Sequence, residues 1–532
     1  MFSRFVVFEA SLAHSKNIKI NKIILMKSLQ HQHVMILGLG NSGLAMARWC
    51  VRFDANVLVV DTRANPPQLE QLKAELPSVK FICSAFEPHL VGASDLAFLL
   101  VSPGIKPVET AELVTRAKEI NVRIGNELTL FNMAMVELNE TQQYRPQVLA
   151  ITGTNGKTTV TSLTGNLVAC ANKSVAVAGN IGPSLLDTLS KKLDVMDLPE
   201  VWVLELSSFQ LNEANGFEPT AAVVLNVTQD HLDWHGNMAS YIEAKYHVFG
   251  LNSSMVINRD DETVMNMLTN AKKSSKLRKY CTFGSDLPTR LGDYGLESVS
   301  GMRWLVRAVS SEELIVKKQR SFIEPVIDLQ MQRLIPTDAL QIRGQHNMLN
   351  ALASLALAES IGCSISKILY GLREYKGESH RVESIGVFNG VEYFDDSKGT
   401  NVGATVAAIS GLGKNKKIVV LLGGDGKGQD FSPLIDVVSK YVRAIVFMGK
   451  DKAVIDEVLK SVDVPKVNVE SMSQAVAAAE KFSQNGDAVL LSPACSSLDM
   501  FDSYEHRGLE FSKVVRDIYA KRAMNLQEGA AL

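Results

Sequence analysis

Cysteine is scarce in this chain, and its few copies stand far apart. Among 532 residues there are six, namely Cys50, Cys83, Cys170, Cys281, Cys363 and Cys495. No two of them share the CxxC or Cys/His spacing of a structural zinc site. A disulfide framework is a device of much smaller secreted chains. We therefore expect six small, buried residues in a reducing compartment.

Long apolar runs and a dominant charge are also absent. No segment reaches the roughly 18 uninterrupted apolar residues that a membrane span needs, so we expect no membrane insertion. The 55 Lys and Arg residues nearly balance the 57 Asp and Glu residues, for a net charge of -2. A chain this neutral is not built around a nucleic-acid-binding surface. Its 46% hydrophobic content excludes disorder as the main state.

Short apolar runs followed by glycine turns and helix-like stretches recur along the chain, which predicts an α/β fold. We predict three consecutive domains: a Rossmann-like N-terminal domain at 31–123, a P-loop-type central ATPase domain with a mostly parallel sheet at 124–377, and a Rossmann-like C-terminal domain at 378–532. Residues 1–30, in which charges interrupt a short apolar stretch, are expected to be an N-terminal extension and not a signal peptide. Residues from about 270 to 340 are polar, and we expect them to be irregular and peripheral.

The segment TGTNGKTT at 152–159 carries the strongest single signal. A strand, a glycine turn, a lysine, hydroxyl residues and then a helix form a design that binds phosphate, because backbone N–H groups and the helix N-terminus face the anion. Lys157 adds a positive charge, and the hydroxyl of Thr158 can hold Mg²⁺. The loop departs from GxxxxGK[ST], since Ile151 stands where the first glycine belongs. The alternative is a tight strand–helix turn with an incidental lysine.

A second glycine motif, GLGNSG at 38–43, matches GxGxxG. Asp61 follows at the end of the next predicted strand, roughly where a ribose-binding acid belongs. This context favours a nucleotide or diphosphate at the turn, but the motif alone does not specify NAD. A glycine turn required only for packing is the alternative.

Further candidates stand at predicted strand ends, where open α/β sheets bind their ligands. Glu205 ends one apolar strand and is well placed for Mg²⁺. The stretch NVTQDHLDWH offers Asp230, His231, Asp233 and His235, one of which we expect to reach the metal or the substrate. Lys245, judged by its sequence context alone, is expected to be a surface lysine. Loops in the third segment contribute charged and hydroxyl residues: Asp396, Lys398, Thr400, Lys427 and Ser497.

Together these motifs resemble the ATP-dependent murein peptide ligases of bacterial cell-wall synthesis. The matching pieces follow in the family's order from about residue 34 to residue 518, and include GLGNSG, DTR, SPGI, TGTNGKTT, GNIG, LELSSFQL, NVTQDHLD, YIEAKYHVF, GQHNMLNALA, HRVE, DDSKGTNVGAT, LLGGDGKGQDFSPL and LLSPACSSLDMF. The phosphate loop alone also fits folylpolyglutamate synthetases. The DSKGTN, GGDGKGQDF and SPACSSLD loops point to the member that adds D-glutamate.

The resemblance implies a role for each matching residue. The UDP-substrate contacts would be Asn41, Ser42, Thr62, Arg63, Gly104, Asn180 and His231. The ATP contacts would be Gly153, Thr154, Asn155, Gly156, Lys157, Thr158, Thr159, Asn347, Asn350, Arg381 and Asp396. The D-glutamate pocket would be lined by Lys398, Thr400, Lys427, Ser497 and Tyr504, although Tyr504 stands where we expect phenylalanine and Gly399 where we expect alanine.

The resemblance also implies the chemistry. The catalytic residues would be Lys157, Glu205, His231 and Lys245, and two Mg²⁺ ions would be held by Thr158, Glu205, His231 and a carbamylated Lys245. ATP would convert the carboxylate of UDP-N-acetylmuramoyl-L-alanine into an acyl phosphate, which the amine of D-glutamate attacks. We expect a cytoplasmic monomer whose C-terminal domain closes onto ATP.

Four alternatives are open to sequence reasoning. A dinucleotide oxidoreductase would use GLGNSG and Asp61, but it leaves the phosphate loop and the third segment unexplained. A P-loop kinase or NTPase would release ADP without an amine. A related ligase would accept another amino acid or a folate. A non-enzymatic nucleotide sensor has no need of Lys157, Glu205, His231 and Lys245 together.

Overall fold

The computed structural model describes residues 27–92, 95–214, 216–272, 278–310, 329–414 and 416–529. Of the predicted N-terminal extension, residues 1–26 lie outside this part of the chain. The chain forms two compact units. The first ends at Thr282 and also contains Ala353–Ile368, and the second consists of Phe283–Leu352 and the residues from Leu369 onward. The crossings between them fall within β11 (Tyr280–Phe283), α13 (Gln345–Ser360) and α14 (Ile365–Glu374).

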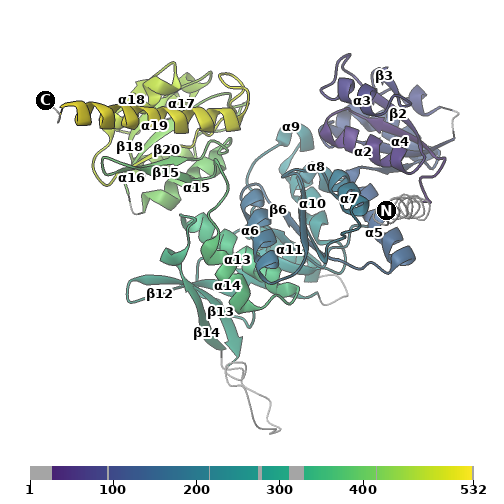
Figure 1. The fold of residues 1–532 in the computed structure, drawn as a ribbon, viewed down its shortest axis with the longest axis horizontal. Helices are drawn as coiled ribbons and strands as arrows, with labels where there is room; N and C mark the ends of the chain where they lie inside the picture. The colour runs from purple at the N-terminus through teal and green to yellow at the C-terminus, as the bar shows by residue number, and fades with distance from the viewer. Residues whose placement is uncertain are drawn as a thin grey trace, which may run out of the picture. The chain divides into compact units, whose positions relative to one another are not determined.

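The first unit begins with a five-stranded sheet in the order β3-β2-β1-β4-β5. All neighbouring strands are parallel, which agrees with the prediction from the apolar runs and the glycine turn. Its strands are β1 (His33–Leu37), β2 (Asn56–Asp61), β3 (Lys80–Cys83), β4 (Leu96–Val101) and β5 (Arg123–Gly125). Its helices are α2 (Asn41–Arg52), α3 (Leu69–Glu75), η1 (Pro88–Val91) and α4 (Pro107–Glu119), and α5 (Glu127–Gln142) leads onward (Figure 1).

A second parallel sheet in this unit has the order β10-β9-β6-β8-β7. Every residue of Val201–Glu205 is buried, as expected for strands that are covered on both faces. The strands are β6 (Gln147–Thr152), β7 (Val175–Gly179), β8 (Val201–Glu205), β9 (Ala221–Val224) and β10 (Ser254–Asn258). The helices are α6 (Lys157–Cys170), α7 (Leu185–Asp194), α8 (Ser208–Leu211), α9 (Leu232–His235), α10 (Met238–Tyr246), η2 (His247–Phe249) and α11 (Glu262–Lys272).

The expectation that residues from about 270 to 340 are irregular was wrong. The second unit begins with β12 (Tyr294–Val299), β13 (Met302–Ser310) and β14 (Leu329–Pro336), followed by η3 (Thr337–Ala339). The three strands pair antiparallel. Each strand mixes polar with apolar residues, and an antiparallel sheet tolerates one solvated face. Such a mixed composition resembles that of a loop when only overall polarity is considered.

The second unit ends in a six-stranded sheet in the order β15-β16-β20-β17-β18-β19. Its neighbours are parallel except for the edge pair β15 and β16, and separate apolar clusters cover its two faces. The strands are β15 (Glu383–Phe388), β16 (Val391–Asp395), β17 (Ile418–Leu422), β18 (Val442–Phe447), β19 (Lys466–Asn468) and β20 (Ala488–Leu491). The helices are α15 (Val402–Gly413), α16 (Leu434–Tyr441), α17 (Lys452–Val458), α18 (Met472–Phe482) and α19 (Tyr504–Gly529), the last of which runs beside α18 (Figure 1).

The prediction from the absence of long apolar runs and the prediction from the few cysteines have different outcomes. None of the helices in the described residues is both long and apolar enough to cross a membrane. The expectation of six buried cysteines was wrong in part, because Cys83 is exposed and Cys170 and Cys281 are only partly buried. Cys83 ends the edge strand β3, where a side chain is less covered than in the middle of a sheet.

Candidate functional site

The phosphate-binding motif lies between the end of β6 and the start of α6. Gly153 and Gly156 have φ values of 157° and 84°, which side-chain-bearing residues rarely adopt. A Cβ on Gly153 would also lie 2.9 Å from the Cβ of Leu225. Helix α6 begins at Gly156 without a side-chain cap, so its first backbone N–H groups can face an anion. The geometry is that of a phosphate site.

Two lysines converge on the same carbonyl of this loop. The Nζ atoms of Lys157 and Lys245 each donate to the backbone oxygen of Gly153 over 2.8 Å. The expectation of a surface position for Lys245 was wrong, since its exposed fraction is only 1%. Burial, and secondarily the charge of Lys157, lowers the pKa of Lys245 well below its usual value. The neutral form of the Lys245 amine is therefore more accessible than that of an exposed lysine.

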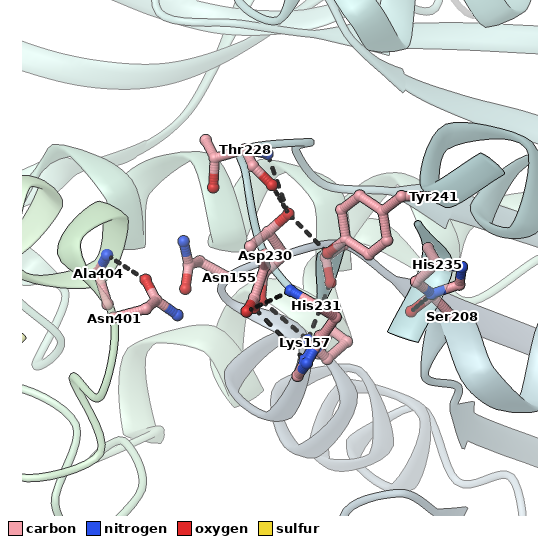
Figure 2. A network of polar contacts seen from close by, with 12 residues as sticks. Asn155, Lys157, Ser208, Thr228, Asp230, His231, His235, Tyr241, Asn401 and Ala404 are labelled. Atoms are coloured by element: carbon pink, nitrogen blue, oxygen red, sulfur yellow. Dashed lines mark hydrogen bonds and ion pairs between the residues drawn. The ribbon is translucent and has the colours of Figure 1, made fainter. Parts of the chain in front are cut away.

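Tyr241 joins Lys245 to the phosphate loop. The ring centroid of Tyr241 lies 4.6 Å from the Nζ atom of Lys245, one helical turn away on α10. Its hydroxyl lies 3.0 Å from the Oγ1 of Thr154, and that oxygen accepts from the backbone N–H of Thr228 at 3.0 Å (Figure 2). These contacts fix the position of the buried amine relative to the loop.

Glu205 ends β8, directly beside the strand that leads into the phosphate loop. Its neighbour in β6 is Ile151. One carboxylate oxygen, Oε1, accepts from the Nδ2 of Asn180 at 2.7 Å. The other, Oε2, is buried and has no hydrogen-bond partner in the part of the chain that the structure describes. A buried carboxylate oxygen without a hydrogen-bond donor lowers the free energy of unfolding. A metal ion is one partner that would satisfy it.

The four acidic and histidine candidates after β9 separate into different environments. His231 opens α9 with a φ of 53° and lies beside Asp230, at 3.5 Å, close to Lys157 (Figure 2). Asp233 forms an ion pair with Lys106 at 3.2 Å. His235 is buried, lies 2.9 Å from the Oγ of Ser208, and has a pKa lowered to about 4 by burial. Of the two histidines, His231 therefore remains the candidate for the site, and His235 is a packed, neutral residue.

The glycine turn of the N-terminal sheet lies at the carboxyl ends of its strands. A Cβ on Gly43 would come within 2.0 Å of the backbone oxygen of Gly38, so this turn requires glycine for close packing. Asn41 and Ser42 open α2, and the side chain of Asn41 accepts from Gln68 at 2.7 Å. Thr62 and Arg63 follow β2, and Gly104 follows β4. The structure thus brings the predicted UDP contacts of this sheet to one edge.

Asp61 does not act as a free ribose-binding acid in this arrangement. Its carboxylate accepts from the backbone N–H of Leu39 at 2.8 Å and from the guanidinium of Arg63 at 2.8 and 2.9 Å. Burial opposes its ionisation, but the hydrogen bonds from Arg63 and Leu39 outweigh burial and lower its pKa. Asp61 therefore holds the two loops together, which removes the main argument for a dinucleotide oxidoreductase.

A cavity of about 290 Å³ opens beside the loop that contains Gly104. Pro103, Ile105, Phe209 and Trp234 are among the residues that line it. The ring of Phe209 also lies 4.7 Å from that of His231. The cavity is therefore lined by direct neighbours of two predicted substrate-binding residues, Gly104 and His231.

In the second unit, three strand-end loops carry the predicted amino-acid-binding residues. Lys398 and Thr400 follow β16, Lys427 follows β17, and Ser497 follows β20. The Nζ of Lys398 lies 3.6 Å from the centre of the Tyr504 ring, an arrangement that stabilises a cation. The loops after β17 and β20 are joined by an antiparallel bridge between Asp425 and Ser496. The structure thus gathers all five predicted residues around adjoining loops.

The remaining predicted nucleotide contacts also lie in this unit. Asn347 and Asn350 are buried near the start of α13, where the Nδ2 of Asn350 donates to Asn347 at 3.0 Å. Asp396 accepts from the Oγ of Ser492 at 2.6 Å. Burial raises the pKa of Asp396 to about 7, against the opposing influence of Ser492 and Arg381. The carboxyl group of Asp396 therefore already has a hydrogen-bond donor in the protein, the hydroxyl of Ser492.

Sequence reasoning missed two buried charged residues, one in each unit. Glu127 has an exposed fraction of 1% and accepts from the backbone N–H of Leu186 at 3.1 Å, and the side chains of Ser42 and Ser184 also hydrogen-bond to it. Arg507 has an exposed fraction of 2%. Both residues lie on helices, α5 and α19. Polar residues adjoin them in the sequence, so the sequence pattern did not predict that they are buried.

Comparison with known proteins identifies the family. Models described as Mur ligase MurD-like N-terminal domain, Mur ligase middle domain, and Mur ligase glutamate ligase domain match residues 32–125, 151–358 and 380–495. A UDP-N-acetylmuramoylalanine–D-glutamate ligase of Albidiferax ferrireducens is 56% identical over 95% of this chain and 100% of its own. The enzymes of the same name from Polaromonas sp. and Burkholderia cenocepacia are 47% and 48% identical, over 94% and 91% of this chain and 100% and 97% of their own.

Solved structures show the same fold at much lower identity. MurF ligase from Thermotoga maritima, in complex with ADP, is 17% identical with a TM-score of 0.55, covering 94% of this chain and 98% of its own. MurF from Acinetobacter baumannii is 16% identical with a TM-score of 0.55, covering 92% and 93%. On the family models and the identities of the relatives taken together, the chain belongs to the Mur ligase family.

Proposed function

We propose that this chain is an ATP-dependent amide ligase that adds D-glutamate to UDP-N-acetylmuramoyl-L-alanine, a cytoplasmic step of peptidoglycan precursor synthesis. The observation that carries the proposal is the 56% identity, over 95% of the chain, to a ligase named for this reaction. The phosphate loop with two adjacent lysines supports the use of ATP.

ATP is assigned to the phosphate loop, with Gly153–Thr159 around its phosphates. The two backbone carbonyls that Lys157 now contacts, those of Gly153 and Thr154 at 2.8 and 2.9 Å, are neutral. A phosphate oxygen is a stronger partner for an ammonium group, so we expect Lys157 to turn toward ATP when ATP binds. Asn347, Asn350, Arg381 and Asp396 are assigned to the rest of the nucleotide.

The residues beside the phosphate loop fit Mg²⁺. Glu205 supplies a carboxylate oxygen that has no donor among the described residues, and Thr158 supplies a hydroxyl from the first turn of α6. His231 and Lys245 would serve a second ion. When bound, Mg²⁺ neutralises charge on the phosphates and on the substrate carboxylate.

Lys245 fits that metal site only if its amine is modified. Mg²⁺ prefers oxygen ligands, whereas an ammonium group would repel it. The lowered pKa of the buried Lys245 makes the neutral amine more available. A neutral amine forms a bond from its nitrogen to the carbon of CO₂ and loses one proton to the solvent, which gives a carbamate. We propose that carbamylated Lys245 presents carboxylate oxygens to the metal.

The acceptor substrate is assigned to the N-terminal sheet and its neighbours. Asn41, Ser42, Thr62, Arg63 and Gly104 would bind the UDP group at the carboxyl edge of the sheet. Asn180, which already orients Glu205, and His231 would contact the groups nearer the reacting carboxylate. The acceptor would thereby extend from the glycine turn toward the phosphate loop.

D-glutamate is assigned to the loops that carry Lys398, Thr400, Lys427, Ser497 and Tyr504. The substrate has two carboxylates, and lysine ammonium groups are suitable partners for them. Its amine would attack the acyl phosphate formed from the acceptor carboxylate and the γ-phosphate of ATP. ADP is released when the carboxylate oxygen bonds to the γ-phosphorus and the bond from that phosphorus to the β-phosphate oxygen breaks. The amine nitrogen then bonds to the carboxyl carbon, the bond from that carbon to the phosphate oxygen breaks, and the amide forms as phosphate leaves and the amine loses a proton.

The three-domain division at 31–123, 124–377 and 378–532, together with a monomeric state, completes the proposal. The test is ADP release by the purified protein with UDP-N-acetylmuramoyl-L-alanine, ATP and Mg²⁺. We expect release that depends on D-glutamate and is much slower with L-glutamate, L-alanine or diaminopimelate. Equal release without any amino acid would indicate a simple NTPase, and preference for another amino acid would indicate a different ligase of the family.

A further inference from the structure

Arg507, in the first turns of α19, is a charged side chain almost wholly removed from water. Its exposed fraction is 2%. Its Nε donates to the Oγ of Ser397 at 2.9 Å, and one terminal nitrogen donates to the backbone oxygen of Ser397 at 2.8 Å. Both terminal nitrogens donate to the backbone oxygen of Cys495 at 3.2 Å. One guanidinium thus binds two separate loops.

Those two loops, and a third tied to them, carry the residues assigned to D-glutamate. Ser397 directly precedes Lys398, and Cys495 stands two residues before Ser497. The neighbour of Cys495, Ser496, exchanges backbone hydrogen bonds of 2.9 and 3.0 Å with Asp425, which stands two residues before Lys427. Arg507 therefore lies at the junction of the loops that follow β16, β17 and β20.

The hydrogen-bond partners of this guanidinium, within the described residues, are all uncharged. Burial lowers the pKa of Arg507 to about 10, so the side chain keeps its charge at neutral pH. The carboxyl groups of Asp499, Asp395 and Asp396 attract it electrostatically from nearby. A buried cation is costly unless its geometry is well satisfied, and here the planar fork satisfies four contacts at once.

We propose that Arg507 is a positioning residue for the amino-acid substrate, which it does not touch: it sets the spacing of the loops that carry Lys398, Lys427 and Ser497. This inference rests on the proposed function, which assigns those side chains to D-glutamate. Two carboxylates bound by separate loops require a fixed distance between the loops, and displacement of a binding group by about 1 Å can reduce the rate by up to 10²-fold. Release of one loop would therefore weaken D-glutamate binding before it affects ATP or the acceptor.

The test is steady-state kinetics of full-length Arg507→Lys and Arg507→Met, each substrate being varied in turn. Lysine keeps the positive charge but lacks the planar guanidinium that donates to two loops at once. Methionine has neither the charge nor the donors. We expect the KM for D-glutamate to rise roughly ten-fold or more, while the KM values for ATP and for UDP-N-acetylmuramoyl-L-alanine stay within about twofold. Ser397→Ala removes the hydroxyl that accepts from Arg507 at 2.9 Å and donates to the backbone oxygen of Tyr504 at 2.8 Å. It keeps the contact of Arg507 with the backbone oxygen of Ser397, so it should raise the KM for D-glutamate by a smaller factor, and it serves if the Arg507 variants do not fold.

A matched control separates positioning from mere stability. Arg443 belongs to the same sheet and forms an ion pair with Asp487 at 3.1 Å through its terminal nitrogen, away from the three loops. Arg443→Met should lower the unfolding temperature but leave the KM for D-glutamate unchanged. The proposal is overturned if folded Arg507→Lys and Ser397→Ala both keep the wild-type KM for D-glutamate, or if the KM values for all three substrates rise together. If the wild-type enzyme prefers another amino acid, the proposed function fails, and the same comparison is made with that amino acid.

Discussion

Replacement of Glu205 by glutamine should make the metal-free protein more stable and the enzyme inactive. In the structure, Oε1 of Glu205 accepts from Asn180 at 2.7 Å, whereas Oε2 is buried without a partner. Glutamine keeps the shape and an oxygen for Asn180 but removes the buried negative charge. A site of this kind is arranged to bind its metal ion, and this arrangement lowers the stability of the metal-free protein.

The magnitude follows from the unpaired oxygen. An unsatisfied buried polar group costs about 1–3 kcal/mol, and a charged one costs more. The amide N–H₂ of glutamine also lacks a partner, so the variant recovers only the difference, which we take as about 1–2 kcal/mol. At roughly 2–4 °C per kcal/mol for a domain of this class, the unfolding temperature in EDTA should rise by roughly 2–8 °C.

The assay is thermal unfolding of both proteins in EDTA and in saturating Mg²⁺, with ADP release measured in parallel. Mg²⁺ at 100 times its Kd should stabilise the wild type by about 2.7 kcal/mol, and this increment should be largely lost in Glu205→Gln. Turnover should fall by roughly 10²-fold or more. A variant that is less stable than the wild type in EDTA, or that keeps the full Mg²⁺ increment, would refute the reasoning.

Glu127→Gln is the matched control. This glutamate is as deeply buried as Glu205, with exposed fractions of 1% for both, but its carboxylate already receives hydrogen bonds from the protein, among them that of Leu186 at 3.1 Å. The same substitution should therefore lower the stability of the protein by about 1 kcal/mol, and the response to Mg²⁺ should persist.

Three further outcomes are expected. Lys157→Ala should abolish acyl phosphate formation but spare binding of the UDP substrate, which isothermal titration measures; wild-type turnover would contradict the role of this lysine. Tyr504→Phe keeps the ring under Lys398 and should leave the KM for D-glutamate within about twofold, whereas Tyr504→Leu should raise it by roughly two- to five-fold, since such a contact contributes about 0.5–1 kcal/mol; equal KM values would exclude the ring contact. Burial lowers the pKa of His346 to about 4, so between that pH and the ordinary pKa of 6.5 the unfolded chain binds more protons than the native one. The free energy of unfolding should therefore fall by about 3 kcal/mol as the pH drops through this window. Chemical denaturation of His346→Gln over the same pH range should show a smaller fall.

The parts of the fold that follow from local pattern were predictable. Apolar runs that end in glycine turns indicated the parallel sheets, and Val201–Glu205 and Gln147–Thr152 are indeed neighbouring parallel strands. The antiparallel strands Tyr294–Val299 and Met302–Ser310 were missed, because their mixture of polar and apolar residues resembles a loop when only polarity is considered. Neither strand alternates strictly between polar and apolar residues, so the period-two signal of a half-buried strand was also weak there.

The site was predictable where it depends on strand ends and unpredictable where it depends on burial. Glu205 and Lys157 follow directly from the topology, since carboxyl ends of parallel strands meet at one edge. Lys245 is different, because a lysine in a short helix is most often exposed and only the packing of α10 against the phosphate loop removes it from water. Burial of an amine depends on contacts that are distant in sequence, such as that between Lys245 and Gly153, and the resemblance to a family was the only sequence-based indication of its role.

The buried charges divide into two kinds, and the division indicates what each is for. Glu127 and Arg507 have protein partners for their polar groups. Their hydrogen bonds hold separate segments of the chain at fixed distances. Glu205 keeps an oxygen without any donor, and Lys245 is held where its ammonium form is disfavoured. Groups of the second kind keep some contacts with the protein, but each also leaves a need that an added partner can meet: a metal ion for the carboxylate and CO₂ for the amine. The gain in stability on addition of Mg²⁺ and bicarbonate should therefore be reduced by substitution of Glu205 or Lys245, and should be unchanged by substitution of Glu127 or Arg507.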